Sequence, residues 1–202
     1  ERYCKMKTPI IILHGWGSSN AAWEITKQIL EKDGYQGFIP DLPGFGKEPP
    51  PKNPWTVSDY VDFVLRFAQL VKLDKFVLIG HSFGGRIAIK LSAQHPEKIE
   101  KLILTGAAGI RFASLKERIK ITLFLLGSKI FNIFFYLPPF NFLKALSRKI
   151  LYYLLDARDY VGLHNEIIKE TFKKVINEDL VETLTKIKVP TYLLWGKDDL
   201  MI

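Results

Sequence analysis

Short apolar segments alternate with longer amphipathic ones along the first half of the chain. The apolar segments are rich in β-branched residues, which is typical of strands covered on both faces. Strands are expected at residues 9–13, 37–40, 76–79 and 101–105. Helices are expected between them, at 21–32, after residue 56 and at 84–95. This alternation predicts a mostly parallel sheet with helices on both faces, which binds ligands at the carboxyl ends of its strands.

Residues at the ends of these segments support the predicted boundaries. Thr56 and Asp59 fit a capping box at the start of the second helix. Gly34 suits a left-handed stop of the first helix, and Pro96 ends the third. Asp41, in the tight turn after the second strand, is expected to bond nearby backbone amides rather than to take part in catalysis.

Residues 110–180 break the alternation of strands and helices. Apolar residues recur there at intervals of three or four, and no credible strand occurs before Thr191. The apolar face is unusually wide, so one side can pack on the sheet and the other can roof a pocket. We predict a helical lid at 110–180, inserted after the strand at 101–105, between two parts of an α/β core at 1–109 and 181–202.

The charge distribution narrows the classes of partner. The net charge is +8, but most of the excess lies within residues 110–160, so a nucleic-acid partner is not expected. A membrane span is not expected either, because Lys129 and Pro138 interrupt the apolar run before about 20 residues accumulate. The basic, Phe-rich lid leaves weak peripheral contact with a membrane open.

Length and cysteine usage indicate the class of protein and its compartment. The 202 residues suffice for one α/β domain with an insertion. A single cysteine, Cys4, excludes a disulfide framework within the chain and fits a reducing compartment. No signal peptide is visible, and a cytoplasmic location is expected.

A glycine-flanked serine follows one of the predicted strands. The motif Gly80-His81-Ser82-Phe83-Gly84 lies between the apolar run 76–79 and the next helix. A sharp strand-to-helix turn needs residues without side chains on both sides of its central residue, and Gly80 and Gly84 supply them. The Ser82 hydroxyl is then lifted clear of the backbone. The pattern predicts Ser82 as a catalytic nucleophile rather than a member of an ordinary glycine-rich turn.

Backbone amides near this serine can stabilise an oxyanion. Phe83 opens the helix after Ser82, where N–H groups lack internal partners. The loop 14–19 (HGWGSS) follows the first strand, and its glycines let the Gly15–Trp16 backbone approach a ligand closely. We predict the amides of Trp16 and Phe83 as the two donors of an oxyanion hole.

A carboxylate follows the last predicted strand. Residues 170–186 indicate one or two helices, and 190–195 indicate a strand that leads into Gly196-Lys197-Asp198-Asp199. A loop after a late strand is where a catalytic triad on such a sheet places the acid that orients a histidine. Asp199 is the predicted acid, and Asp198 is the alternative.

Four segments in this order, HGWGSS, DLPGFGKEP, GHSFGG and KVPTYLLWGKDD, resemble the α/β-hydrolase superfamily. The chain is similar in particular to the lid-bearing small bacterial serine hydrolases and esterases. The resemblance implies the α/β-hydrolase fold, with Ser82 as nucleophile, Asp199 as triad acid and the Trp16 and Phe83 amides as oxyanion hole. It also implies a catalytic histidine after one further strand.

The catalytic base is not expected among the four histidines of this chain. His14 and His81 are expected to be structural, His95 suits a helix end, and His164 falls in the lid. The chain stops at Ile202, before the strand that would precede the implied histidine, so we expect an excerpt of a longer protein. Because a serine hydroxyl needs a base, the 202-residue chain alone is expected to be inactive.

The expected activity is hydrolysis of a carboxylic ester or related acyl bond through an acyl-serine intermediate, with a small hydrophobic substrate. No metal or organic cofactor is implied. Serine at the elbow argues against reactions that need a carboxylate nucleophile. Hydrolysis of a C–C bond or a thioester stays open, as does a non-catalytic, ligand-binding member of the same fold.

Overall fold

The computed structural model describes residues 7–107 and 165–197. The chain divides into two units, residues 1–110 with 165–202 and residues 111–164, and the described residues all belong to the first. Their strands are β1 (Ile10–Leu13), β2 (Gly37–Phe38), β3 (Phe76–Ser82), β4 (Ile99–Ala107) and β5 (Thr191–Leu194). Their helices are α1 (Glu24–Lys32), α2 (Val57–Leu70), α3 (Phe83–Gln94), α7 (Glu166–Asn177) and α8 (Val181–Leu184), with short 3-10 turns at Asn20–Trp23 and Pro96–Lys98.

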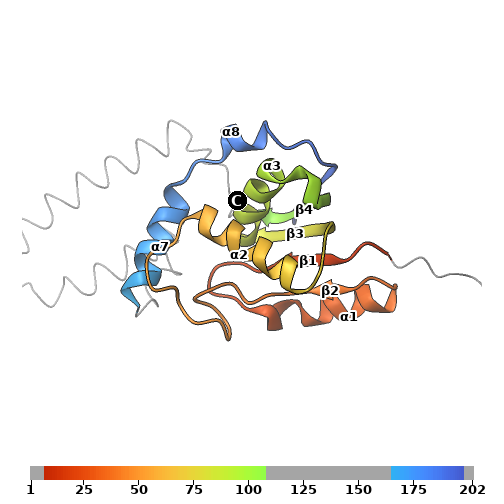
Figure 1. Cartoon of the computed structure of the whole chain (residues 1–202), viewed down its shortest axis with the longest axis horizontal. Helices are drawn as coiled ribbons and strands as arrows, with labels where there is room; N and C mark the ends of the chain where they lie inside the picture. The colour runs from red at the N-terminus through yellow and green to blue at the C-terminus, as the bar shows by residue number, and fades with distance from the viewer. Residues whose placement is uncertain (1–6, 108–164, 198–202) are drawn as a thin grey trace, which may run out of the picture. The chain divides into compact units, whose positions relative to one another are not determined.

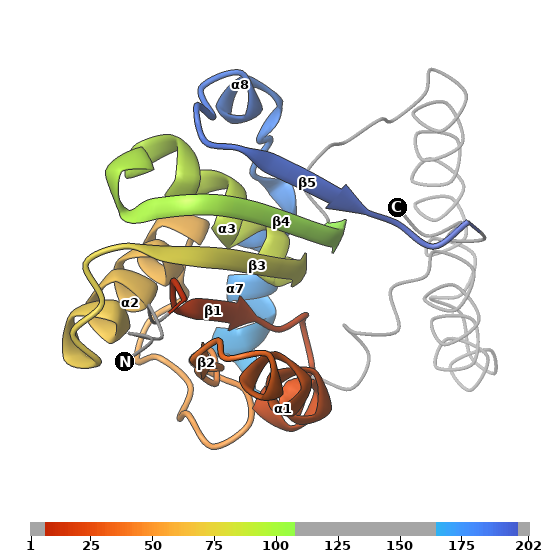
Figure 2. The ribbon, with the colours of Figure 1, turned by 90° about the vertical axis from the view of Figure 1, so that its right-hand side faces the viewer.

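The described strands form one parallel sheet, as the sequence predicts. Its order is β2-β1-β3-β4-β5, and all four pairings are parallel. The arrowheads in Figure 2 therefore point the same way. In such a sheet the carboxyl ends of all strands meet at one edge, where Ser82 and the loop after Leu13 both lie.

Alternating side chains along the strands build two separate apolar layers. Ile11, Leu13 and Leu78 face the larger layer, which is formed with α2, α3 and α7, whereas Ile10 and Val77 face a smaller layer formed with α1. The helices thus cover both faces, which confirms the predicted layering (Figure 1).

The predicted helix boundaries are largely confirmed. Thr56 and Asp59 form the capping box at the start of α2, where Asp59 accepts a hydrogen bond of 2.6 Å from the Thr56 N–H. Gly34 has φ 82° after α1. Along α1, however, Ile25 and Ile29 are 74% and 55% exposed, so its regular apolar spacing does not mark a buried stripe.

The helix α7 belongs to the sheet unit, although the lid was predicted to continue to residue 180. Val175 and Ile168 on α7 are buried, and the Thr171 hydroxyl accepts a hydrogen bond of 3.0 Å from the Trp55 N–H. The division of the chain into two units falls between residues 164 and 165. The predicted lid before this point lies outside the described residues.

Candidate active site

Ser82 occupies a strained turn between β3 and α3. It is the last residue of the strand and the N-cap of the helix, and its backbone has φ 48° and ψ −114°. Positive φ is unfavourable for residues with a Cβ atom, and in the described part of the chain only Lys72 shares it among non-glycine residues. Such strain persists only where the surrounding structure enforces it, and it gathers at functional sites.

Glycines around Ser82 permit backbone-to-backbone packing. A Cβ atom on Gly84 would lie 2.3 Å from the carbonyl oxygen of Leu13, and one on Gly80 would lie 2.7 Å from the carbonyl oxygen of Gly84. These distances are far below van der Waals contact, so neither position accepts a side chain. The glycines that the sequence singles out therefore let α3 sit directly on β1 and β3.

The Gly15–Trp16 peptide lies beside Ser82. A Cβ atom on Gly15 would be 3.4 Å from the Ser82 Cβ. The Gly15 carbonyl oxygen lies 2.8 Å from the His14 Nδ1 and accepts a longer hydrogen bond of 3.3 Å from the Ser18 N–H. Because N–H and C=O point in opposite directions in a trans peptide, fixing this carbonyl also fixes the direction of the Trp16 N–H. The second candidate donor, the Phe83 N–H, stands at the first residue of α3.

His14 is a structural residue that supports the candidate oxyanion loop. Its ring is fully buried, and its Nε2 accepts a hydrogen bond of 3.0 Å from the Leu42 N–H. Since Nε2 accepts, the neutral ring carries its proton on Nδ1 and donates it to the Gly15 carbonyl. Burial lowers the pKa of His14 below 6.5, because the charged imidazolium is poorly solvated there.

Asp41 has the structural role that the sequence predicts. Its carboxylate accepts hydrogen bonds from the Asn20 N–H at 2.7 Å and from the Lys47 N–H at 2.9 Å. These bonds join the loop after β1 to the turn after β2. Asp41 thus holds two loops at the carboxyl edge of the sheet.

An aromatic cluster surrounds the candidate oxyanion loop. The Trp16 ring makes edge contacts with Phe45, Phe83 and Phe172, at centroid distances of 4.8, 5.0 and 4.9 Å. The contacts of Phe45 and Phe172 were missed from the sequence, because these residues lie far from Trp16 along the chain and no local pattern brings them together. Because Trp16 and Phe83 carry the candidate oxyanion donors, their ring contacts join the aromatic cluster to the candidate site.

The predicted triad acid cannot be placed, because Asp198 and Asp199 lie outside the described residues. Their preceding strand is placed: Leu194 of β5 is in register with Thr105 of β4, which is in register with His81 of β3. The carboxyl end of β5 thus reaches the same edge as the serine turn, two strands away.

Each of the described histidines contacts a group other than the candidate acid. His14 bonds the backbone as above. The His81 ring packs edge-on against Trp23 at 5.8 Å, and the His95 ring lies 3.5 Å from a Glu97 carboxylate at the surface. His164 lies outside the described residues.

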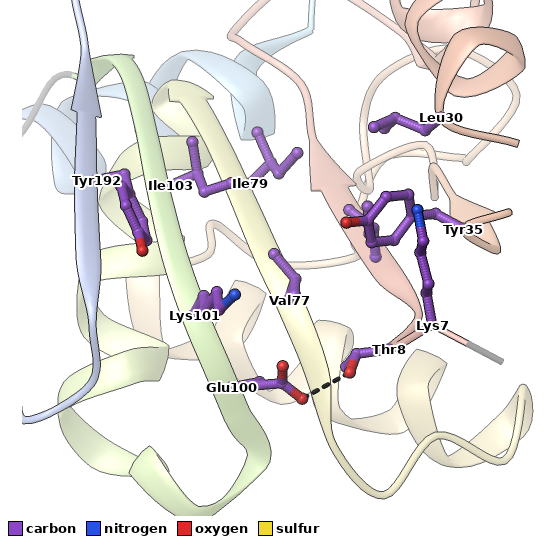
Figure 3. A pocket seen from close by; sticks show the side chains of 11 residues that line it. Lys7, Thr8, Leu30, Tyr35, Val77, Ile79, Glu100, Lys101, Ile103 and Tyr192 are labelled. Carbon is purple, nitrogen blue, oxygen red and sulfur yellow. Dashed lines mark hydrogen bonds between the residues drawn. The ribbon is translucent and has the colours of Figure 1, made fainter. Parts of the chain in front are cut away.

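A separate groove lies on the α1 side of the sheet, away from Ser82. It has a volume of about 610 Å³, and Ile79, Ile103 and Tyr192 form its apolar floor (Figure 3). At its lower end the Thr8 hydroxyl donates a hydrogen bond of 2.6 Å to Glu100. The groove contains none of the candidate catalytic residues, so we do not assign the chemistry to it.

Comparison with known proteins identifies the family. A family model described as the alpha/beta hydrolase fold matches residues 8–202. The chain therefore belongs to the α/β-hydrolase family, as its sheet order and serine elbow indicate.

Curated relatives carry several hydrolase names. The AB hydrolase superfamily protein YisY of Bacillus subtilis is 30% identical, over 95% of this chain and 74% of YisY. The abhydrolase domain-containing protein abhd-5.2 of Caenorhabditis elegans is 33% identical, over 80% of this chain and 39% of that protein. Monoacylglycerol lipase ABHD6 of Homo sapiens is 26% identical, over 96% of this chain and 62% of the lipase. This chain thus spans less than two thirds of two of these relatives.

Solved structures show the same fold. A bacterial membrane phospholipase A superposes with a TM-score of 0.63 at 26% identity, over 95% of this chain and 63% of that one. An esterase from Exiguobacterium antarcticum superposes with a TM-score of 0.65 at 24% identity, over 93% of this chain and 72% of the esterase. In the described part of the present chain, no helix is both long and apolar enough to cross a bilayer.

The buried His14 predicts a pH-dependent stability. Its pKa is lowered from 6.5 in the folded state, so the unfolded chain binds a proton that the folded chain does not. The free energy of unfolding should therefore fall as the pH drops below about 6.5, by up to about 1.4 kcal/mol per pH unit. Urea unfolding between about pH 7.5 and pH 5 measures this slope, and His14→Gln should flatten it. An equal slope in both proteins would contradict the assignment.

Proposed function

We propose that the protein is a serine hydrolase that cleaves carboxylic esters or related acyl bonds, with Ser82 as its nucleophile. The observation that carries the proposal is the strained backbone of Ser82, φ 48°, at the junction of β3 and α3. Neither a strand nor a helix requires a serine with positive φ at this position. A turn that presents a hydroxyl at the carboxyl edge of the sheet does require it.

Two backbone amides are the proposed oxyanion donors. When the Ser82 oxygen attacks a carbonyl carbon, the carbonyl oxygen gains negative charge that N–H groups can stabilise. The Trp16 N–H belongs to the peptide that lies beside Ser82, and the Phe83 N–H belongs to the first residue of α3. Removing one such donor typically lowers kcat by about 10²- to 10³-fold, so these amides would supply much of the catalysis.

A complete triad needs an acid and a base as well. We propose Asp199 as the acid, with Asp198 as the alternative, because β5 ends at the same sheet edge as β3, with β4 between them. Neighbouring strands are about 4.8 Å apart, so a loop after β5 begins about 10 Å from the serine strand. That distance leaves room for an imidazole between the acid and Ser82, which would take the hydroxyl proton and pass it to the leaving alcohol.

The relatives favour an acyl substrate with a hydrophobic part. Their names include a monoacylglycerol lipase and a membrane phospholipase A. The 2-hydroxymuconate semialdehyde hydrolase of a Pseudomonas strain is also similar, at 31% identity over 52% of this chain, and keeps C–C bond hydrolysis as the second candidate. Thioester hydrolysis and ligand binding without turnover are the remaining alternatives.

The roles of the three candidate side chains predict a ranking of variants. In the whole protein, Ser82→Ala should abolish ester turnover, because the proposed acyl-enzyme forms on the Ser82 hydroxyl. Asp199→Asn should leave a small residual rate, since losing the orienting acid costs less than losing the nucleophile. Asp198→Asn should change kcat/KM by no more than about threefold. Steady-state hydrolysis of a p-nitrophenyl ester measures all three.

Two outcomes would revise these assignments. Damage by Asp198→Asn with a mild effect of Asp199→Asn would move the acid by one position. Unchanged turnover in Ser82→Ala would refute the nucleophile, and with it the proposed function.

Acyl-chain length should control specificity. Each buried methylene contributes about 0.8 kcal/mol, so four additional methylenes raise kcat/KM by roughly two orders of magnitude if the acyl pocket is apolar. A series of p-nitrophenyl esters from acetate to octanoate measures this directly. A flat or falling series would exclude a hydrophobic acyl pocket.

A further inference from the structure

We propose that Phe172 is a positioning residue of the candidate active site. Its ring holds the Trp16 side chain in place, and thereby the peptide whose N–H is the proposed oxyanion donor. This inference rests on the proposed function, because it assumes that the Trp16 N–H stabilises an oxyanion formed beside Ser82.

Hydrogen bonds hold the loop that carries Trp16 at the Gly15 carbonyl and again at the Asn20 N–H. His14 holds the carbonyl of Gly15, on one side of the peptide. On the other side, Gly17 has φ 69°, and among the described residues no atom outside its two chain neighbours lies within 4 Å of the place where its Cβ would be. Between these two points, the packed Trp16 side chain lies nearest in the chain to the donor amide.

Among the described residues, the Trp16 side chain is held by packing, and three of its neighbours are aromatic rings. Its Nε1 is buried and has no hydrogen-bond partner among the described residues. Three rings meet the indole edge-on, each at a centroid distance of about 5 Å. Since no polar contact of Nε1 compensates, loss of one ring should let the indole and its backbone shift.

Phe172 differs from the other two rings in its origin. Phe45 and Phe83 belong to the loop after β2 and to the nucleophile helix, so changing them disturbs the site directly. Phe172 comes from α7 and touches the indole at 4.9 Å with an interplanar angle of 60°. Its effect on the oxyanion loop can therefore be tested apart from the rest of the site.

The helix α7 has other attachments, so removing the Phe172 ring should not release it. The Thr171 hydroxyl accepts a hydrogen bond from the Trp55 N–H, and Val175 is only 1% exposed. Just after α7, the Glu178 carboxylate pairs with Lys90 of α3 at 2.5 Å. Loss of the ring should thus leave a local gap beside Trp16 while α7 stays in place.

The test compares Phe172→Ala with Val175→Ala in the whole protein. Both changes remove apolar packing from α7, but only Phe172 can make a ring contact with Trp16. Each variant is assayed for kcat and KM with a p-nitrophenyl ester, for the Ki of an alkylboronic acid that forms a tetrahedral adduct with the serine, and for thermal unfolding.

Phe172→Ala should lower kcat about 10- to 100-fold and raise the boronate Ki in parallel, with KM within about threefold, because the lost interaction is made in the transition state. Val175→Ala should keep kcat and Ki within about threefold despite equal or greater loss of stability. Phe172→Tyr, which keeps the ring, should recover most of the activity. Should Phe172→Ala not fold, Phe172→Leu replaces it, with an expected drop of about three- to tenfold.

Three results would overturn the inference. One is wild-type kcat and Ki in a destabilised Phe172→Ala protein, which would make the residue merely structural. Another is an equal loss of kcat in Val175→Ala. The third is failure of the proposed function itself, visible as a wild-type protein that neither turns over the ester nor binds the boronate. The wild-type assay separates this last case from the first two.

Discussion

The close contact between the Gly84 backbone and the Leu13 carbonyl is the constraint on which the candidate site depends. A side chain at position 84 would meet that oxygen at 2.3 Å, so the second residue of α3 must be glycine. The contact brings the start of α3 against the end of β1, and it therefore brings Ser82 against the loop that follows β1. The pairing of Leu13 with Gly80 already makes the ends of β1 and β3 neighbours, and this contact closes the distance between the nucleophile turn and the Gly15–Trp16 peptide.

Other interactions hold the loops around the start of α3 and the end of β1. His14 and Asp41 bond backbone groups and hold the loops after β1 and β2 at the carboxyl edge of the sheet. The aromatic rings around Trp16 then fill the space between these loops, α3 and α7. Strain at Ser82, on the order of 1–3 kcal/mol, persists because this packing leaves its backbone no alternative.

Features that depend on local chemistry could be predicted from the sequence. The serine turn follows from glycines two positions to either side of Ser82, and the start of α2 follows from Thr56 and Asp59. The parallel sheet follows from apolar runs that alternate with amphipathic helices. These features can be predicted because the residues that cause each of them are near one another in the chain.

Features that depend on distant partners could not be predicted. Helical periodicity in α7 shows an apolar face, but it does not reveal that this face packs on the sheet unit, as Ile168 and Val175 do. Ile25 and Ile29 recur at helical spacing in α1, yet both are exposed among the described residues, so periodicity alone does not tell which face is buried. The strand β3 also runs beyond Ile79 to Ser82, because pairing with β4 continues past the apolar run.

The most direct test of the account is covalent labelling of the whole protein with an alkyl fluorophosphonate, followed by peptide mass mapping. The account predicts a single adduct on the peptide that contains Ser82, formed by the folded protein and lost on prior denaturation, because only the held turn and its amides make this hydroxyl reactive. Absence of an adduct, or labelling spread over other serines, would contradict the assignment of Ser82 as an activated nucleophile.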